Sequence, residues 1–79
     1  MKLYCGIDLH SNNHYVSIVD QDNNRLKEKR IGNGLSKTLA LLKPYKADLE
    51  GIAIESTFNW YWLVDGLMDA GYPVSLVNT

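Results

Sequence analysis

The sequence predicts an α/β fold built on a mixed β-sheet, with elements in the order β-β-β-α-β-α-β. Three observations predict this fold class. Short polar turns separate the first three extended segments, which favours an antiparallel meander. Apolar residues then recur at helical spacing in two later segments. Each helical segment leads into a short apolar run, and a helix that crosses between strands implies parallel, right-handed pairing.

Three extended segments occupy the first part of the chain. Lys2–Leu9 is a nearly continuous apolar run, as expected of a central strand that is buried on both faces. His14–Asp20 is rich in β-branched and aromatic residues, which favour strands. Arg25–Ile31 is mostly polar, so we expect it at an edge of the sheet. The polar stretches 11–13 and 21–24 between them are typical of tight turns.

The first predicted helix covers Leu35–Leu42, where leucines recur at helical spacing. The glycines on either side of Asn33 end the preceding strand, and Asn33 itself is a candidate helix cap. Pro44 is expected to stop the helix. The run Gly51–Glu55 is apolar except for its last residue, so we predict a buried parallel strand there.

The second predicted helix covers Asn59–Ala70, with Ser56 or Thr57 as its cap. Its apolar side chains form a one-sided stripe that should face the core. The stripe consists of Trp60, Leu63, Val64, Leu67 and Met68. Gly71 suits the left-handed position after a helix end, and Pro73–Val77 is predicted as a last strand. Because no element follows to cover that strand, we expect residues 1–79 to be a piece of a longer protein.

The composition allows one small domain and gives no overall electrostatic signal for a nucleic-acid partner. The chain has 79 residues, eight of them Lys or Arg and nine Asp or Glu, for a formal net charge of −1. A basic surface must therefore be local. The one basic cluster falls in the predicted edge strand, where lysines commonly serve to prevent sheet-to-sheet association. The cluster consists of Arg25, Lys27, Lys29 and Arg30.

The cysteine content and the lack of long apolar segments bear on localisation. The single cysteine, Cys5, lies in an apolar run and can form no intrachain disulfide. We expect a buried, unreactive thiol in a reducing cytoplasm. No segment resembles a signal peptide or a membrane span, so we expect no membrane partner.

Two acidic residues end apolar strands: Asp8 in the first, and Glu55 in the strand after the first helix. If these strands are parallel neighbours, about 4.8 Å apart, both carboxylates leave the sheet at the edge where open α/β sheets bind ligands. Their mutual repulsion would be relieved by Mg²⁺ or Mn²⁺, which can assist phosphodiester cleavage. Turn formation for Asp8 and a helix-dipole role for Glu55 are the ordinary alternatives, and the spacing alone leaves them open.

The motifs around these acids resemble a known family. The motif Gly6–Asp8, followed by a polar turn and the strand Val16–Asp20, resembles the start of a RuvC-like domain. Ala53–Thr57, followed by Tyr61–Leu63, is similar to the second motif of the DEDD-type insertion-sequence transposases of the IS-one-ten family. Gly71–Val74, ahead of a strand, fits the same pattern. The resemblance covers essentially the whole chain, and the combination is more specific than the first motif alone.

The resemblance implies a ribonuclease-H-like fold with sheet order 3-2-1-4-5, truncated here, so that residues 1–79 form the N-terminal part of a transposase catalytic domain. Asp8 would be the first D and Glu55 the E of the DEDD set, binding Mg²⁺ or Mn²⁺, while the other two acids would lie beyond Thr79. The implied function is metal-dependent DNA strand cleavage and exchange during transposition of an insertion sequence in a bacterial cytoplasm. The fragment alone would be inactive. A guide RNA and a serine nucleophile in a C-terminal domain are also implied, and neither maps onto residues of this chain. Separately, the short core and the open edge of the predicted sheet suggest self-association, so we expect a homo-oligomer.

The loop after the first acid departs from the family pattern. Many relatives carry a lysine soon after Asp8, where this chain has the stretch 10–13. Ser11 and Asn12 are candidate nucleic-acid contacts, although turn formation explains them equally. His10 has the chemistry to transfer a proton or bind a metal, but an ordinary loop histidine is the simpler interpretation.

Three further residues are given ordinary roles. His14 is expected only to begin a strand. Tyr61 and Trp62 lie off the apolar stripe of their helix, so we expect them to pack against segments outside this chain or to stack on a guide RNA.

Other function classes stay open from the sequence. An actin-like sugar kinase or ATPase lobe also begins with a strand, Gly-Ile-Asp and a hairpin. Its phosphate loop needs small residues after the aspartate, where this chain has Leu9 and His10. A non-catalytic assembly module of the same fold predicts no metal at Asp8 and Glu55. A Rossmann nucleotide binder is disfavoured because no Gly-x-Gly-x-x-Gly motif follows the first strand.

Overall fold

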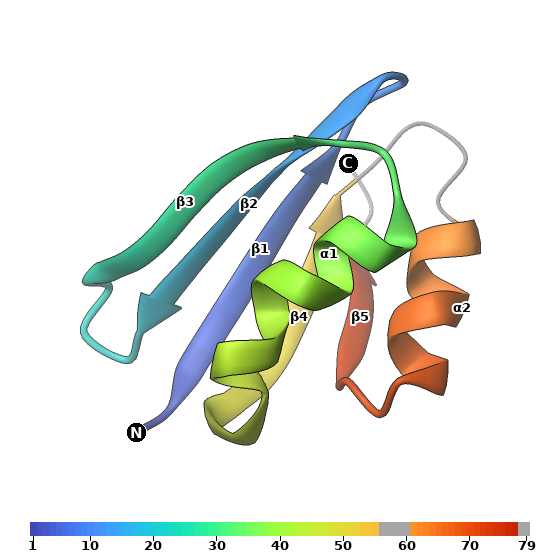
Figure 1. Cartoon of the computed structure of the whole chain (residues 1–79). Helices are drawn as coiled ribbons and strands as arrows, with labels where there is room; N and C mark the ends of the chain where they lie inside the picture. Colours follow the sequence, from blue (N-terminus) through green and yellow to red (C-terminus); the bar gives the residue numbers. More distant parts are fainter. Residues whose placement is uncertain (56–60, 78–79) are drawn as a thin grey trace.

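The computed structural model describes residues 1–55 and 61–77, and five strands form one sheet (Figure 1). The strands are β1 (Leu3–Leu9), β2 (Asn13–Asp20), β3 (Arg25–Gly32), β4 (Leu49–Glu55) and β5 (Val74–Val77). Their order is β3-β2-β1-β4-β5, which confirms the predicted order 3-2-1-4-5. The central strand β1 pairs antiparallel with β2 and parallel with β4.

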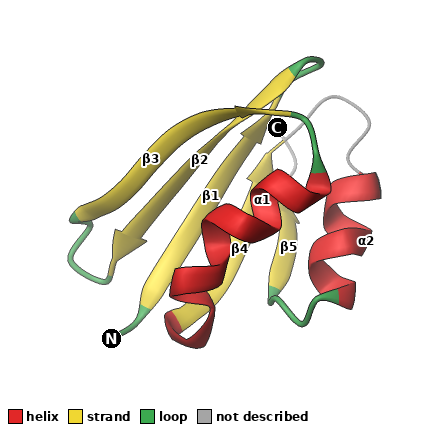
Figure 2. Cartoon of the chain, viewed as in Figure 1, coloured by secondary structure: helices red, strands yellow, loops and turns green. Residues whose placement is uncertain are grey.

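Both α-helices lie on the same face of the sheet (Figure 2). They are α1 (Leu35–Leu42) and α2 (Tyr61–Asp69), with a 3₁₀ helix, η1 (Lys43–Asp48), directly after α1. The crossovers β3-α1-β4 and β4-α2-β5 move along the sheet in the same direction, and right-handed crossovers of one direction place their helices on one side. No helix among the described residues is long and apolar enough to cross a membrane.

Among the described residues, only this face of the sheet is covered. Buried and exposed side chains alternate along β1, with Leu3, Cys5, Ile7 and Leu9 packed under the helices. β4 alternates in the same way over most of its length. The prediction that β1 is buried on both faces is therefore wrong within the described residues, because its alternate positions face an open side of the sheet. β4 is parallel to β1 as predicted, and it is buried on the helical face only.

The edge strand β3 is polar and exposed, as the sequence predicted. Only one of its residues, Ile31, is partly buried. This exposure fits the basic cluster of β3, whose long side chains remain in solvent.

The first helix covers Leu35–Leu42 and ends before Pro44, as predicted. The chain then continues as the 3₁₀ helix η1 with Pro44 at its start, where a helix needs no N–H donor. β4 begins at Leu49, two residues before the predicted start. Gly71 has φ +88°, as predicted for the residue after a helix end.

The apolar stripe predicted for α2 is buried at its centre, as expected, but the prediction is wrong at the end of the stripe. Leu63 and Leu67 are fully buried, whereas Met68 is 57% exposed. Each helical residue turns by about 100°, which moves Met68 from the core to the flank. The predicted caps Ser56 and Thr57, and the stripe residue Trp60, lie outside the described residues.

Cys5 lies in the core beneath the helices, 2% exposed, as predicted. Burial raises the pKa of its thiol from 9.0 to about 12. The thiolate is the reactive form of cysteine, so the folded chain protects this residue both sterically and electrostatically.

We expect Cys5 to resist a thiol reagent at pH 8 in the folded protein and to react at once in denaturant. Above pH 9 the unfolded chain loses the thiol proton while the folded chain keeps it. The free energy of unfolding should therefore fall as the pH rises from 9.0 to about 12. A Cys5→Ala variant, compared with the parent by chemical denaturation across this range, should lack this contribution. Rapid labelling of the folded parent would contradict the burial argument.

Candidate functional site

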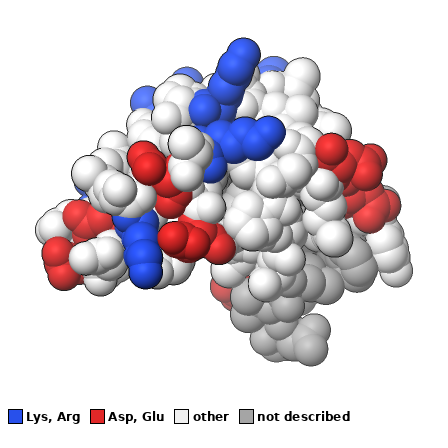
Figure 3. Space-filling model, turned by 90° about the horizontal axis from the view of Figure 1, so that it is seen from below, with Lys and Arg blue, Asp and Glu red and all other residues white. Residues whose placement is uncertain are grey.

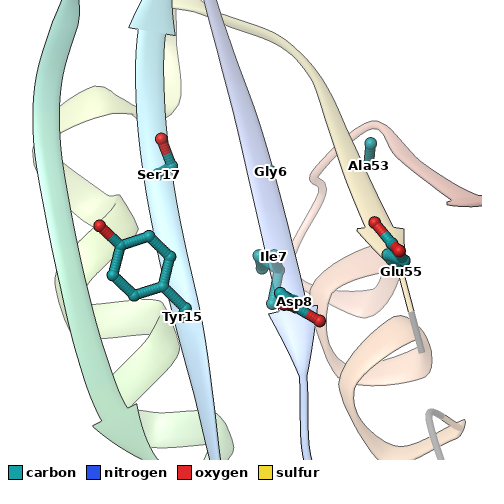
Figure 4. Close-up of a pocket in the computed structure, with 7 residues that line it drawn as sticks. All are labelled: Gly6, Ile7, Asp8, Tyr15, Ser17, Ala53 and Glu55. Atoms are coloured by element: carbon teal, nitrogen blue, oxygen red, sulfur yellow. The ribbon is translucent and has the colours of Figure 1, made fainter. Parts of the chain in front are cut away.

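The two predicted acids face each other across adjacent parallel strands. The register of β1 and β4 places Asp8 directly opposite Glu55. Both occupy exposed positions of the alternating pattern, so both lie on the open face, away from the helices. In Figure 4 the carboxylate of Asp8 extends from β1 toward β4, where Glu55 lies. The structure thus brings the pair together at one rim of the sheet, as the sequence predicted.

The acids line an open hollow on this face, which we call the acidic hollow. Its volume is about 250 Å³. It is lined by Gly6, Ile7, Asp8, Tyr15, Ser17, Ala53 and Glu55 (Figure 4). The hollow exists because small residues form its centre: a Cβ atom added to Gly6 would meet nothing within 4 Å. A ligand can therefore approach the backbone between the two acidic strands.

The electrostatics of the hollow favour a cation. Asp8 is 56% exposed and its Oδ2 atom lies 3.3 Å from Nε2 of His10, so this loop histidine adjoins the acid. Within the described residues, no three acidic, histidine or cysteine side chains converge on one point. Mg²⁺ commonly takes one or two protein carboxylates and keeps several waters. Two carboxylates in register thus suit a hard divalent cation, although they do not enclose it.

Elsewhere the charges are mixed. The end of the sheet opposite the carboxyl ends of β1 and β4, seen in Figure 3, carries both acidic and basic side chains, and neither sign dominates. This distribution agrees with the formal net charge of −1. Any nucleic-acid surface must therefore be local.

The sequence matches the family model for transposases of the DEDD type and IS-one-ten group over residues 5–79. The chain belongs to this transposase family. No curated protein matches the sequence. The match confirms the resemblance seen in the motifs around Asp8 and Glu55.

Solved structures confirm the fold of the transposase chain. RuvC from T. thermophilus, solved with a Holliday junction substrate, has a TM-score of 0.79 and 15% identity, over 99% of this chain and 65% of RuvC. A ROK family protein from Streptococcus pneumoniae TIGR4, in complex with sucrose, has a TM-score of 0.58 and 21% identity, over 96% and 34%. The Argonaute of Marinitoga piezophila, with a 5′ OH guide RNA, has a TM-score of 0.58 and 16% identity, over 98% and 16%.

These identities show the fold alone, which is RuvC-like and ribonuclease-H-like. The sheet order and the helix placement agree with this fold. The likeness to a ROK family protein shows why the sequence left a kinase-like lobe open, since the two classes share these elements. The match to the family model distinguishes between these two classes and assigns the chain to the transposases. The chain spans less than two thirds of each of these three solved chains.

The loop beside Asp8 is held by a residue that the sequence analysis misassigned. Asn33 was predicted to cap α1, but Gly34 is the cap residue and no side chain bonds to the helix end. The side-chain amide of Asn33 instead donates to the carbonyl oxygens of His10, at 2.8 Å, and Ser11, at 3.1 Å. These bonds tie the β1–β2 loop of the transposase chain to the start of α1.

The same amide determines that Nδ1 of the His14 ring carries a proton. Because Nδ2 of Asn33 faces two carbonyls, its Oδ1 atom faces Nδ1 of His14 at 2.8 Å, and this ring nitrogen must carry a proton and donate. The other ring nitrogen lies 2.8 Å from the hydroxyl of Thr38. His14 is fully buried, so it does more than begin a strand as predicted. The signal was present, because His14 alternates with Val16 and Ile18 on the buried face of β2.

The remaining predicted contacts divide into two kinds. Ser11 and Asn12 are exposed in the loop, with their side chains in solvent. Trp62 is half-buried against the core, its ring centroid 6.1 Å from that of His14 in an edge-to-face arrangement. The prediction that Trp62 packs only outside this chain is therefore wrong. Tyr61 is 62% exposed.

We expect Asn33→Ala to lower the free energy of unfolding by about 1–3 kcal/mol, because it leaves the buried Nδ1 donor of His14 unpaired. It should also speed amide exchange at His10, whose N–H donates to Asn13 at 2.9 Å within the loop. Hydrogen exchange followed by NMR measures both effects. The matched control is Asn24→Ala, which removes an exposed turn bond to Asp20. If both variants altered exchange at His10 equally, the loop-holding role of Asn33 would be wrong.

Proposed function

We propose that this chain is the N-terminal part of a transposase catalytic domain, and that Asp8 and Glu55 hold Mg²⁺ or Mn²⁺ for cleavage and exchange of DNA strands. The observation that carries the proposal is the β1–β4 register, which sets the two carboxylates side by side on an open face. Membership of the transposase family supplies the reaction class. The fold shared with RuvC, which was solved with a Holliday junction substrate, supports a DNA partner.

The chemistry follows from the two acids and the space beside them. Carboxylate oxygens are ligands that hard divalent cations prefer. Such a cation stabilises negative charge that develops on a phosphate during strand cleavage. The chain itself supplies the carboxylates that would hold the cation and, at Gly6 and Ala53, a surface without bulky side chains where a phosphate backbone can approach.

In this proposal, residues 1–79 hold only part of the metal-binding site. The described residues offer two carboxylates at the hollow, and RuvC has about a third of its length outside the shared region. We infer that the other two acids of the DEDD set come from residues beyond Thr79, and that this chain alone does not cleave DNA. A guide RNA is a further proposal, supported by the family resemblance. A homo-oligomer and a cytoplasmic location are also proposed, the first from the exposed edge of the sheet and the second from the single cysteine of the chain.

Metal binding can be tested on this chain with Mn²⁺, whose unpaired electrons broaden nearby NMR signals. We expect the strongest broadening at the amides of Asp8 and Glu55. Asp8→Asn and Glu55→Gln should each weaken it, because each removes one of two ligands. The control is Glu50→Gln, which changes an exposed acid near the other end of β4. Broadening that is strongest away from the hollow, or unchanged in both ligand variants, would favour a non-catalytic module.

Catalysis requires the full-length transposase. We expect Asp8→Asn and Glu55→Gln each to reduce the rate of strand cleavage by more than about 100-fold. Mutating a residue that only supports a metal ligand already lowers metal affinity or activity by about 10–100-fold, and these variants change the ligands themselves. Cleavage of a labelled donor DNA on denaturing gels measures this loss. Glu50→Gln should cleave at the parent rate. Undiminished cleavage by either ligand variant would overturn the assignment.

A further inference from the structure

A row of four side chains crosses the open face, from the acidic hollow to the edge of the sheet. The registers pair Asp8 with Glu55 of β4 and with Tyr15 of β2, and they pair Tyr15 with Arg30 of β3. Directly paired residues in a sheet point to the same face. All four side chains therefore share the face opposite the helices, in the order Glu55, Asp8, Tyr15, Arg30.

Arg30 is held in place within this row. Its guanidinium carbon lies 5.9 Å from the ring centroid of Tyr15, which places the cation over the aromatic face. Its Nη1 atom donates to Oδ1 of Asn13 at 3.3 Å. A guanidinium has five N–H donors, and the described residues occupy one of them. The charge is thus oriented while most of its donors are available to a ligand.

The neighbouring charges leave Arg30 without a carboxylate partner among the described residues. Glu28, two residues earlier on β3, forms its ion pair with Arg25 instead. Burial, followed by a hydrogen bond to Glu28, raises the pKa of the Tyr15 hydroxyl. The Glu28 carboxylate is thus engaged by Arg25 and by the Tyr15 hydroxyl.

We propose that Arg30, seated over Tyr15, binds a backbone phosphate of the nucleic-acid strand whose reacting phosphate lies at Asp8 and Glu55. The location of the reacting phosphate rests on the proposed function. Arg30 is two strands from Asp8, or about 10 Å. At this separation, the phosphate that Arg30 binds lies close along the strand to the reacting phosphate.

The position of Arg30 reduces the electrostatic repulsion between the site and a nucleic-acid strand. Two carboxylates repel a phosphate backbone, and the chain has no overall positive charge. A fixed cation on one side of the acids offsets this repulsion. Because Arg30 lies on the β3 side of the acids, it also sets the path along which the strand crosses the sheet.

A second group of cations lies on the opposite face. Lys29 and Lys37 line a hollow between β3 and α1, together with Ile31, Ala40 and Leu41. Its mostly apolar lining suits a phosphate less well than the polar row does. Lys29 is nevertheless a matched control, because it adjoins Arg30 on the same exposed strand and pairs with the buried Val16, which places it on the other face.

The first experiment titrates the ¹⁵N-labelled chain with a short single-stranded DNA and with an RNA of the same sequence, with and without Mg²⁺. We expect saturable chemical-shift changes at the Arg30 side chain and at Tyr15, for both nucleic acids. Changes confined to the face of Lys29 and Lys37, changes that depend on base sequence, or no change at Arg30 would each overturn the proposal.

The second experiment measures affinity by fluorescence anisotropy at several salt concentrations. Arg30→Gln should weaken binding and reduce the magnitude of the logarithmic salt slope by about 0.7–0.9, the value for one lost phosphate contact. Arg30→Lys should keep the salt slope but bind less tightly than the parent, because lysine lacks the planar fork that stacks on Tyr15. Lys29→Gln should match the parent. Equal losses in Arg30→Gln and Lys29→Gln would show a nonspecific charge effect and overturn the assignment.

The two proposals fail separately. Arg30→Gln with parent-like binding, in a protein whose Asp8→Asn variant does not cleave, overturns the phosphate contact alone. Cleavage that survives Asp8→Asn, together with weakened binding by Arg30→Gln, overturns the metal site and leaves a phosphate-binding role for Arg30.

Discussion

The site depends on the parallel pairing of β1 with β4. The chain brings Asp8 and Glu55 together only because the hydrogen-bond ladder makes them direct partners. That register is fixed by the core, since Ile7 and Ile54 pair beside the acids and are both buried under the helices. A slip by one residue would turn each apolar side chain of β4 to solvent and move Glu55 to the helical face. The apolar packing of one face thus determines the chemistry of the other.

The one-sided placement of the helices gives this chain two unlike surfaces. The covered face holds the apolar core and the buried His14 network, which ties the β1–β2 loop to α1. The open face holds the acidic hollow and the row that ends at Arg30. The loop residue His10 joins the two systems, because its carbonyl accepts from Asn33 while its ring lies beside Asp8. Rigidity on the covered side therefore supports the position of the polar groups on the open side.

Several sequence predictions failed where one residue had two plausible uses. Asn33 lies between glycines and suited a helix cap, yet its side-chain amide forms hydrogen bonds with the β1–β2 loop and with His14. Trp62 lay off the apolar stripe, yet the buried histidine gives its ring a partner. In each case the local pattern was compatible with both outcomes, and a contact distant in sequence decided between them.

The order of the elements, the polar edge strand and the position of both acids at strand ends could all be predicted from the sequence, because periodicity, turn residues and apolar runs are local properties of the chain. The motifs also indicated the transposase family. The sequence could not predict which face each acid occupies, which face the helices cover, or that Tyr15 and Arg30 continue the row from Asp8. These features depend on the register between strands that are distant in sequence, and register is set by the packing of the whole sheet against its helices.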